Sequence, residues 1–201
     1  FIKMKTLFIG DIVGRKARNF AIEKIKEFKD GKYFDLIIVN VENSAGGFGV
    51  TPEICDQFLL NGADVLTSGN HIWDKKEIIS YINETNKLLR PMNMVDGTPG
   101  LGITIIDTSF GKIGVANVMT NLFMPKSNPV FEVLNKIKLK FNSNENLCFS
   151  LVDVHGEATS EKLAIGHLLD GHVSAVVGTH THIPTSDYRA VSYTHLTLPT
   201  T

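Results

Sequence analysis

The sequence predicts an α/β protein in which two β-sheet layers are flanked by helices. Short, continuous apolar runs alternate along the chain with amphipathic segments of helical length. The runs at 36–41 and 147–154 are long enough, and apolar enough, to be strands covered on both faces. Almost every such run ends directly before a polar residue, which is the third feature typical of this class.

The first half of the chain yields alternating strands and helices. Residues 6–9 are apolar and end at Gly-Asp, which indicates a strand that runs into a loop. Residues 19–28 place aromatic and aliphatic side chains among Glu and Lys at helical spacing. The β-branched run at 36–41 predicts a buried strand. Thr51 and Pro52 then open a helix, with Thr as the N-cap and Pro at the first helical position.

The second half continues the pattern. Residues 65–67 form a short expected strand, and Asp74 is expected to cap the helix that follows it. The runs at 102–106 and 113–118 are separated by a short turn and predict a hairpin. The remaining elements are a helix at 130–141, a strand at 147–154, a helix at 159–169 and a strand at 173–177.

Composition excludes several classes of protein. Twenty Lys and Arg balance 21 Asp and Glu among 201 residues, so no overall basic excess points to nucleic acid or to an anionic membrane. The chain has no apolar run of about 18 residues and no signal-peptide pattern. Cys55 and Cys148 are too few for a disulfide framework and lack CxxC spacing, so we expect reduced, partly buried thiols in a cytoplasmic protein.

Residues able to bind a metal follow five expected strands. Taken singly, several have ordinary explanations, because Asp and Asn are common in turns and caps. Two histidines spaced two apart can face one cavity when the chain is extended. Taken together, the set predicts metal binding, with seven candidate ligands: Asp11, Glu42, Asn43, Asn70, His155, His180 and His182. His71 follows the same strand as Asn70.

The mixture of ligand types limits the metal. Imidazole, carboxylate and amide oxygen without thiolate suit Mn, Fe, Zn or Co rather than an iron–sulfur cluster or Cu(I). The candidates exceed the four ligands of a structural zinc site and suit two ions about 3.5–4 Å apart. Glu42 is the candidate for a carboxylate that bridges the two ions.

Longer motifs around these positions resemble the YmdB-type family of the calcineurin-like metallophosphoesterase superfamily. They are LFIGDIVG from residue 7, VENSA from 41, SGNHIWDKKE from 68, RPMN from 90, HGEATSEK from 155 and VVGTHTH from 176. Val13 stands where many superfamily members have His, and Glu42 where Asp is common, and both changes are typical of this branch. The resemblance covers about residues 4–187 and implies a sandwich of two mixed β-sheets flanked by helices.

The resemblance also implies a role for each site residue. Asp11, Glu42, Asn43 and His182 would hold one ion, and Glu42, Asn70, His155 and His180 the other, with Fe or Mn favoured over Zn or Co. A hydroxide shared by the ions would attack a phosphodiester such as a 2′,3′-cyclic nucleotide. His71 would protonate the departing sugar oxygen. Backbone amides of Gly46 and Gly47 are candidates for stabilising charge, although a flexible turn is their commoner role.

Three other functions stay open at this point. The same ligand set would serve a phosphomonoesterase or a protein phosphatase. A metal-containing regulatory protein that associates with nucleotides or RNA, with little turnover, is a second alternative, although it would not need His71. A purely structural histidine cluster is the third. A link to RNA and a homo-oligomer are compatible with each of these functions.

The two ends of the chain depart from the family pattern. Met4 is the expected natural start, so the preceding residues 1–3 are expected to be non-native. The resemblance stops after Asp187, so residues 188–201, which carry little charge, are expected to be non-native as well. The expected domain is therefore 4–187, without the C-terminal part of the family fold, and an exposed sheet edge would reduce its stability.

Overall fold

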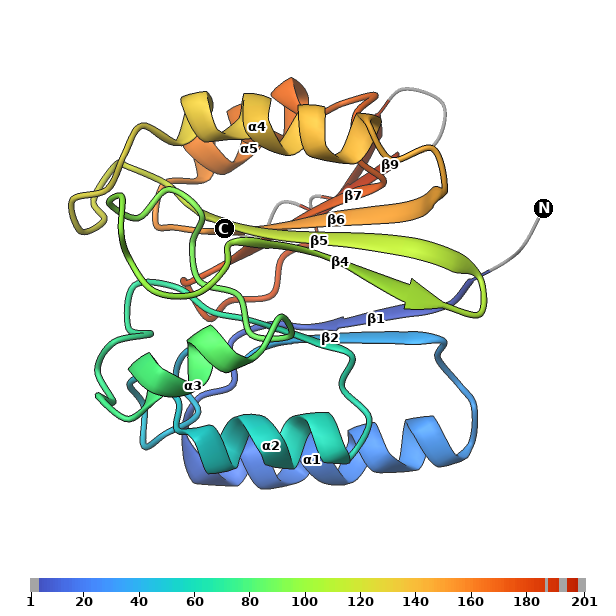
Figure 1. Ribbon diagram of the computed structural model, residues 1–201, viewed down its shortest axis with the longest axis vertical. Coiled ribbons are helices and arrows are strands. Elements are labelled where there is room, and N and C mark those ends of the chain that lie inside the picture. Colours follow the sequence, from blue (N-terminus) through green and yellow to red (C-terminus); the bar gives the residue numbers. More distant parts are fainter. Residues whose placement is uncertain (1–3, 187, 192–194, 199–201) are drawn as a thin grey trace. The chain divides into compact units, whose positions relative to one another are not determined.

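The computed structural model describes residues 4–186, 188–191 and 195–198, which belong to two compact units (Figure 1). The first unit contains the chain up to Leu89 together with Pro99–Leu101. The second contains Arg90–Thr98 and the chain from Gly102 onward. The expectation for residues 1–3 lies outside the described residues, and the single domain at 4–187 stays a prediction.

The first unit is built on a three-stranded parallel sheet in the order β1-β2-β3. Its strands are β1 (Thr6–Ile9), β2 (Leu36–Asn40) and β3 (Val65–Thr67), and its helices are α1 (Gly14–Asp30), α2 (Pro52–Leu60) and α3 (Ile78–Glu84). Every residue of β2 is buried, which explains its continuous apolar run. Figure 1 shows α1 and α2 side by side on one face of this sheet.

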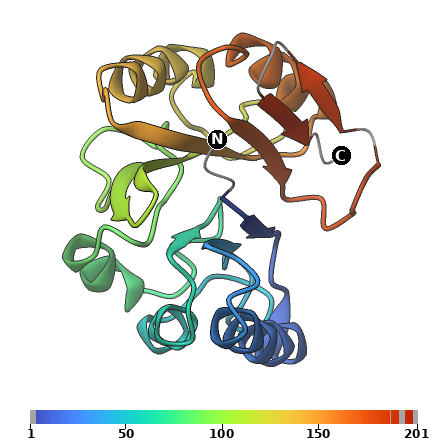
Figure 2. The same ribbon diagram turned by 90° about the vertical axis from the view of Figure 1, so that its right-hand side faces the viewer.

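The second unit contains a six-stranded mixed sheet in the order β4-β5-β6-β7-β9-β8. Its strands are β4 (Ile103–Thr108), β5 (Gly111–Met119), β6 (Leu147–His155), β7 (Ala175–Thr179), β8 (Arg189–Val191) and β9 (His195–Leu198). The helices α4 (Val130–Asn142) and α5 (Thr159–Leu168) lie together on one face of the sheet (Figure 2). Buried side chains of α4, α5, β5 and β6 form the core beneath them.

The predicted α/β class with two sheets flanked by helices is confirmed, with three differences in detail. The first sheet is parallel rather than mixed, because each connection between its strands contains a helix. α3 begins at Ile78, so Asp74 does not cap it. Cys55 is buried, which raises the pKa of its thiol, whereas Cys148 is exposed rather than partly buried.

The chain after Asp187 contributes strands to the second unit. β9 pairs with β7 in parallel, and β8 pairs with β9 antiparallel. These pairings do not bear on whether residues 188–201 are native, which stays a prediction. Within the residues that the structure describes, no helix is both long and apolar enough to cross a membrane.

Asn93 joins the segment after Leu89 to the end of β5. Its side chain is fully buried, and its amide nitrogen donates to the carbonyl oxygens of Met119 (2.7 Å) and Asn128 (3.1 Å). Its amide oxygen accepts the backbone N–H of Met119 at 2.8 Å. Met119 pairs in register with His155 on β6, so Asn93 supports the strand ends that carry the candidate histidines.

Replacing Asn93 tests whether its buried amide stabilises the end of β5. Asn93→Ala leaves the N–H and C=O of Met119 without their partner and should lower the free energy of unfolding by about 2–4 kcal/mol. Urea unfolding followed by circular dichroism measures the change. Asn135→Ala, on the exposed face of α4, is the matched control and should change stability by less than about 0.5 kcal/mol. Equal stability of the two variants would show that Asn93 has no such role.

Candidate functional site

The candidate residues of the first unit lie at the carboxyl end of its parallel sheet. Asp11 follows β1, Glu42 and Asn43 follow β2, and Asn70 follows β3. Backbone hydrogen bonds connect the three strand ends: the N–H of Ile12 donates to Asn40 (3.1 Å), and the N–H of Val41 to Thr67 (2.9 Å). The sheet therefore brings these four side chains to neighbouring loops, as the sequence predicted.

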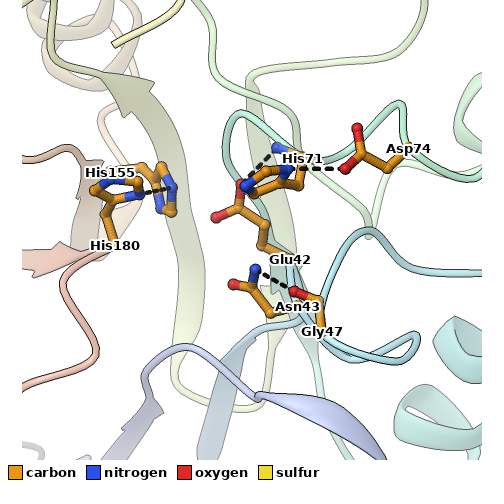
Figure 3. Close-up of polar contacts among 7 residues, drawn as sticks. All are labelled: Glu42, Asn43, Gly47, His71, Asp74, His155 and His180. Carbon is orange, nitrogen blue, oxygen red and sulfur yellow. Dashed lines mark hydrogen bonds and ion pairs between the residues drawn. The ribbon is translucent and has the colours of Figure 1, made fainter. Parts of the chain in front are cut away.

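Glu42 is the central carboxylate of this group. Its side chain is fully buried, and its Oε1 accepts the backbone N–H of His71 at 2.6 Å (Figure 3). Its own backbone N–H donates to Oδ1 of Asn40 at 3.1 Å. Glu42 thus connects the loop after β2 to the loop after β3. A carboxylate at this depth is costly unless donors or a cation compensate its charge, which favours a metal ligand here.

Asn43 presents a buried oxygen to the same region. Its amide nitrogen donates to the carbonyl of Gly47 at 2.9 Å, and this bond fixes the orientation of the amide (Figure 3). Among the residues that the structure describes, Oδ1 of Asn43 has no hydrogen-bond partner although it is buried. A buried acceptor without a partner costs about 1–3 kcal/mol, and a bound cation would remove that cost.

The glycine pair after Asn43 forms a turn. Gly46 has a φ of 78° and Gly47 a φ of 105°, values that favour glycine. The N–H of Gly47 already donates to the carbonyl of Asn43 at 3.1 Å. The amide of Gly47 is therefore part of the turn itself, which supports the structural role of the pair over the stabilisation of charge.

His71 is held on both sides of its ring. Its Nδ1 lies 2.8 Å from Oδ2 of Asp74 (Figure 3). Its ring also makes an edge-to-face contact with the ring of Phe48, with 4.9 Å between ring centroids. A proton on Nδ1 directed at Asp74 leaves Nε2 as the ring nitrogen that can face a ligand. Asp74, expected as a helix cap, therefore orients His71 instead.

Two candidate histidines of the second unit lie in contact. His155 ends β6 and is fully buried, and His180 follows β7. Nε2 of His155 and Nδ1 of His180 are 3.1 Å apart (Figure 3). Two nitrogens that each lie about 2.1 Å from one ion are themselves about 3.0–3.4 Å apart, so the pair has the spacing of two ligands of a single metal.

The chain between His180 and His182 is bent rather than extended. His180 has a φ of 101° and His182 a φ of 57°, so the extended backbone assumed for this pair is wrong. Left-handed conformations in residues other than glycine cost about 1–3 kcal/mol and cluster at functional sites. Nε2 of His180 lies 3.3 Å from Oε2 of Glu157, whereas His182 is exposed at the surface of its unit.

Sequence reasoning missed residues that support the candidate ligands. Phe48 and Asp74 flank His71, and Asp153 and Thr179 lie behind His155. Asp153 carried a signal, because it is a carboxylate inside an otherwise apolar strand. Phe48 and Thr179 gave none, since an aromatic residue or a threonine beside glycine is ordinary in a loop or at a strand end. Asp74 was expected to cap a helix.

Comparisons with known proteins show which proteins this chain is similar to. A 2′,3′-cyclic-nucleotide 2′-phosphodiesterase of Bacillus subtilis (strain 168) is 41% identical over 186 residues, which are 92% of this chain and 70% of that protein. A crystal structure of a hypothetical protein from Thermus thermophilus matches with a TM-score of 0.88 and 35% identity, over 97% of this chain and 75% of that one.

A further solved structure and a family profile extend the match. The crystal structure of a phosphatase from Mycoplasma pneumoniae superimposes with a TM-score of 0.87 and 30% identity, over 98% of this chain and 70% of that one. The profile described as YmdB-like protein matches residues 7–197, nearly the whole chain, and the resemblance inferred from the motifs is confirmed. The chain belongs to the YmdB-like protein family.

Proposed function

We propose that this protein is a metal-dependent phosphodiesterase that hydrolyses small nucleotides, with 2′,3′-cyclic nucleotides as the substrate class. The names of its relatives, a phosphodiesterase and a phosphatase, support a hydrolase that acts on phosphoester bonds. The observation that carries the metal dependence is the buried amide oxygen of Asn43, which has no hydrogen-bond partner among the described residues and lies next to the buried carboxylate of Glu42.

Two cations, iron or manganese, would be held by the seven candidate ligands. The proposal assigns Asp11, Glu42, Asn43 and His182 to one ion, and Glu42, Asn70, His155 and His180 to the other. When bound, such cations neutralise a phosphate group and lower the pKa of a bound water to about 7.

In the proposed mechanism, His71 is the residue that protonates the leaving group. Asp74 holds its Nδ1, and the bond from its backbone N–H to Glu42 fixes the position of its main chain. When the ring is protonated, Nε2 can deliver its proton to the departing sugar oxygen. Proton transfer from a positioned side chain contributes about 100- to 10,000-fold to a rate.

A phosphomonoesterase is the second candidate, because a similar solved structure is described as a phosphatase. The ligand set does not separate the two activities. The oriented pair of His71 and Asp74 favours either enzyme over a regulatory protein with little turnover, because simple binding needs no proton donor. A cytoplasmic location, an RNA link and a homo-oligomer stay predictions.

A substrate panel tests the activity and its metal dependence together. Protein loaded with Mn²⁺ or Fe²⁺ should hydrolyse 2′,3′-cAMP faster than 3′,5′-cAMP and p-nitrophenyl phosphate. Chelation should abolish turnover, and the return of the metal should restore it, because the cations supply the charge neutralisation. Preferred cleavage of p-nitrophenyl phosphate would favour the phosphomonoesterase, and full activity after chelation would rule out the metal mechanism.

His71→Ala should separate metal binding from turnover. The variant should keep the metal content of the parent and lose about 100- to 10,000-fold in kcat on 2′,3′-cAMP, because only the proton donor is removed. Elemental analysis and steady-state kinetics measure the two quantities. His167→Ala, an exposed histidine of α5, is the control and should behave as the parent. A His71→Ala enzyme with the parent's kcat would refute the assignment.

Glu42→Gln tests the shared carboxylate. The amide keeps the shape of the side chain but loses its negative charge, so the affinity for both ions should fall together, by about 10-fold or more. A metal titration monitored by calorimetry gives the stoichiometry and the affinity. Glu23→Gln, exposed on α1, controls for the general loss of a charge. Loss of one ion alone, or of neither, would contradict a bridging role.

A further inference from the structure

In the second unit, buried hydrogen bonds connect His155 to Thr179 and Thr179 to Asp153. Oγ1 of Thr179 donates to Oδ1 of Asp153 at 2.7 Å, and Nδ1 of His155 lies 3.0 Å from the same hydroxyl oxygen. Asp153 and His155 are fully buried, and Thr179 is 3% exposed. His155 and Thr179 are direct partners in the pairing of β6 with β7, so the contact is set by strand register.

The direction of these bonds determines where the proton of His155 lies. A hydroxyl has one proton, and an ionised carboxylate can only accept a hydrogen bond. Since Thr179 donates its proton to Asp153, its oxygen must accept the proton on Nδ1 of His155. A neutral ring that carries its proton on Nδ1 has its lone pair on Nε2, the atom that lies 3.1 Å from Nδ1 of His180.

Packing alone does not account for these buried hydrogen bonds. The flanking side chains Val152 and Val154 are apolar, and a valine at 179 would have nearly the shape of threonine. Buried polar groups of this kind add stability only when each is satisfied, and an apolar replacement is often neutral. The buried ammonium of Lys162 adds a bond to the carbonyl of Thr179 at 3.3 Å, which holds the backbone just before the bend at His180.

We propose that Asp153 and Thr179 are positioning residues, which hold His155 in the tautomer that offers Nε2 to a metal ion. The proposal rests on the proposed function, because it assumes that His155 is a ligand. It goes beyond that function in assigning roles to two residues that would not touch the metal. Hydrogen-bond partners of this kind are typically worth about 10- to 100-fold in metal affinity.

The first test is to determine the tautomer of His155 in the metal-free protein of 201 residues. Nitrogen-15 correlation spectra of the histidine rings, at about pH 8, where an ordinary imidazole is neutral, should show the proton of His155 on Nδ1. The Thr179→Val variant keeps the shape of the side chain but lacks the hydroxyl. In this variant the spectra should show the Nε2–H tautomer of His155 as well as the Nδ1–H tautomer. Thr179→Ser restores a hydroxyl and should restore the tautomer. A proton on Nε2 of His155 in the parent would overturn the proposal.

Titration with Mn²⁺ provides the second readout. The affinity of Thr179→Val should fall about 10- to 100-fold and recover in Thr179→Ser. Thr104→Val, a buried threonine of β4 in the same sheet, is the matched control and should bind as the parent. Equal Mn²⁺ affinity in the parent and in folded Thr179→Val would overturn the role. Should Thr179→Val fail to fold, Asp153→Asn takes its place, with weaker Mn²⁺ binding expected and parental affinity as the contrary result.

The two proposals fail in different ways. A folded parent that takes up no Mn²⁺ or Fe²⁺ would refute the proposed function, and with it the metal-directed role of Asp153 and Thr179. A parent that binds metal and hydrolyses 2′,3′-cAMP, together with a Thr179→Val variant of unchanged affinity, would leave the function standing. That result would refute the positioning role alone.

Discussion

Parallel pairing of neighbouring strands is the constraint on which the placement of the candidate residues in each unit depends. Strands that run in the same direction end at the same edge of a sheet, and their following loops become neighbours. In the first unit this alignment gathers the loops after β1, β2 and β3. In the second it places the end of β6 beside the end of β7. Residues far apart in sequence thereby become neighbours.

Burial makes these strand ends chemically unusual. Glu42 and His155 are fully buried, and the amide oxygen of Asn43 is buried without a hydrogen-bond partner among the described residues. Each of these groups loses its contact with water on folding, and an apolar residue in its place would not carry that cost. This cost is the physical reason for proposing a cation at these strand ends.

Support from neighbouring side chains is a second shared feature of the two units. Asp74 orients the ring of His71, and Thr179 orients the ring of His155. In both cases an oxygen lies beside Nδ1, so that Nε2 is the ring nitrogen available to a ligand. An imidazole nitrogen offers either a proton or a lone pair, and the partner of the other nitrogen helps to decide which. The same kind of contact thus orients the candidate proton donor in one unit and a candidate metal ligand in the other.

The sequence by itself determined the class of fold, the order of most elements and the strand ends that carry the candidate ligands, because apolar periodicity and turn chemistry are local properties. The continuous apolar run that became β2 is an example. Only the tertiary structure decided the pairing of His71 with Asp74 in place of a helix cap, and the bend at His180. It also revealed the bond between His155 and Thr179, which are 24 positions apart and meet only through the register of β6 and β7. Such contacts depend on how strands pair, and no local pattern contains that information.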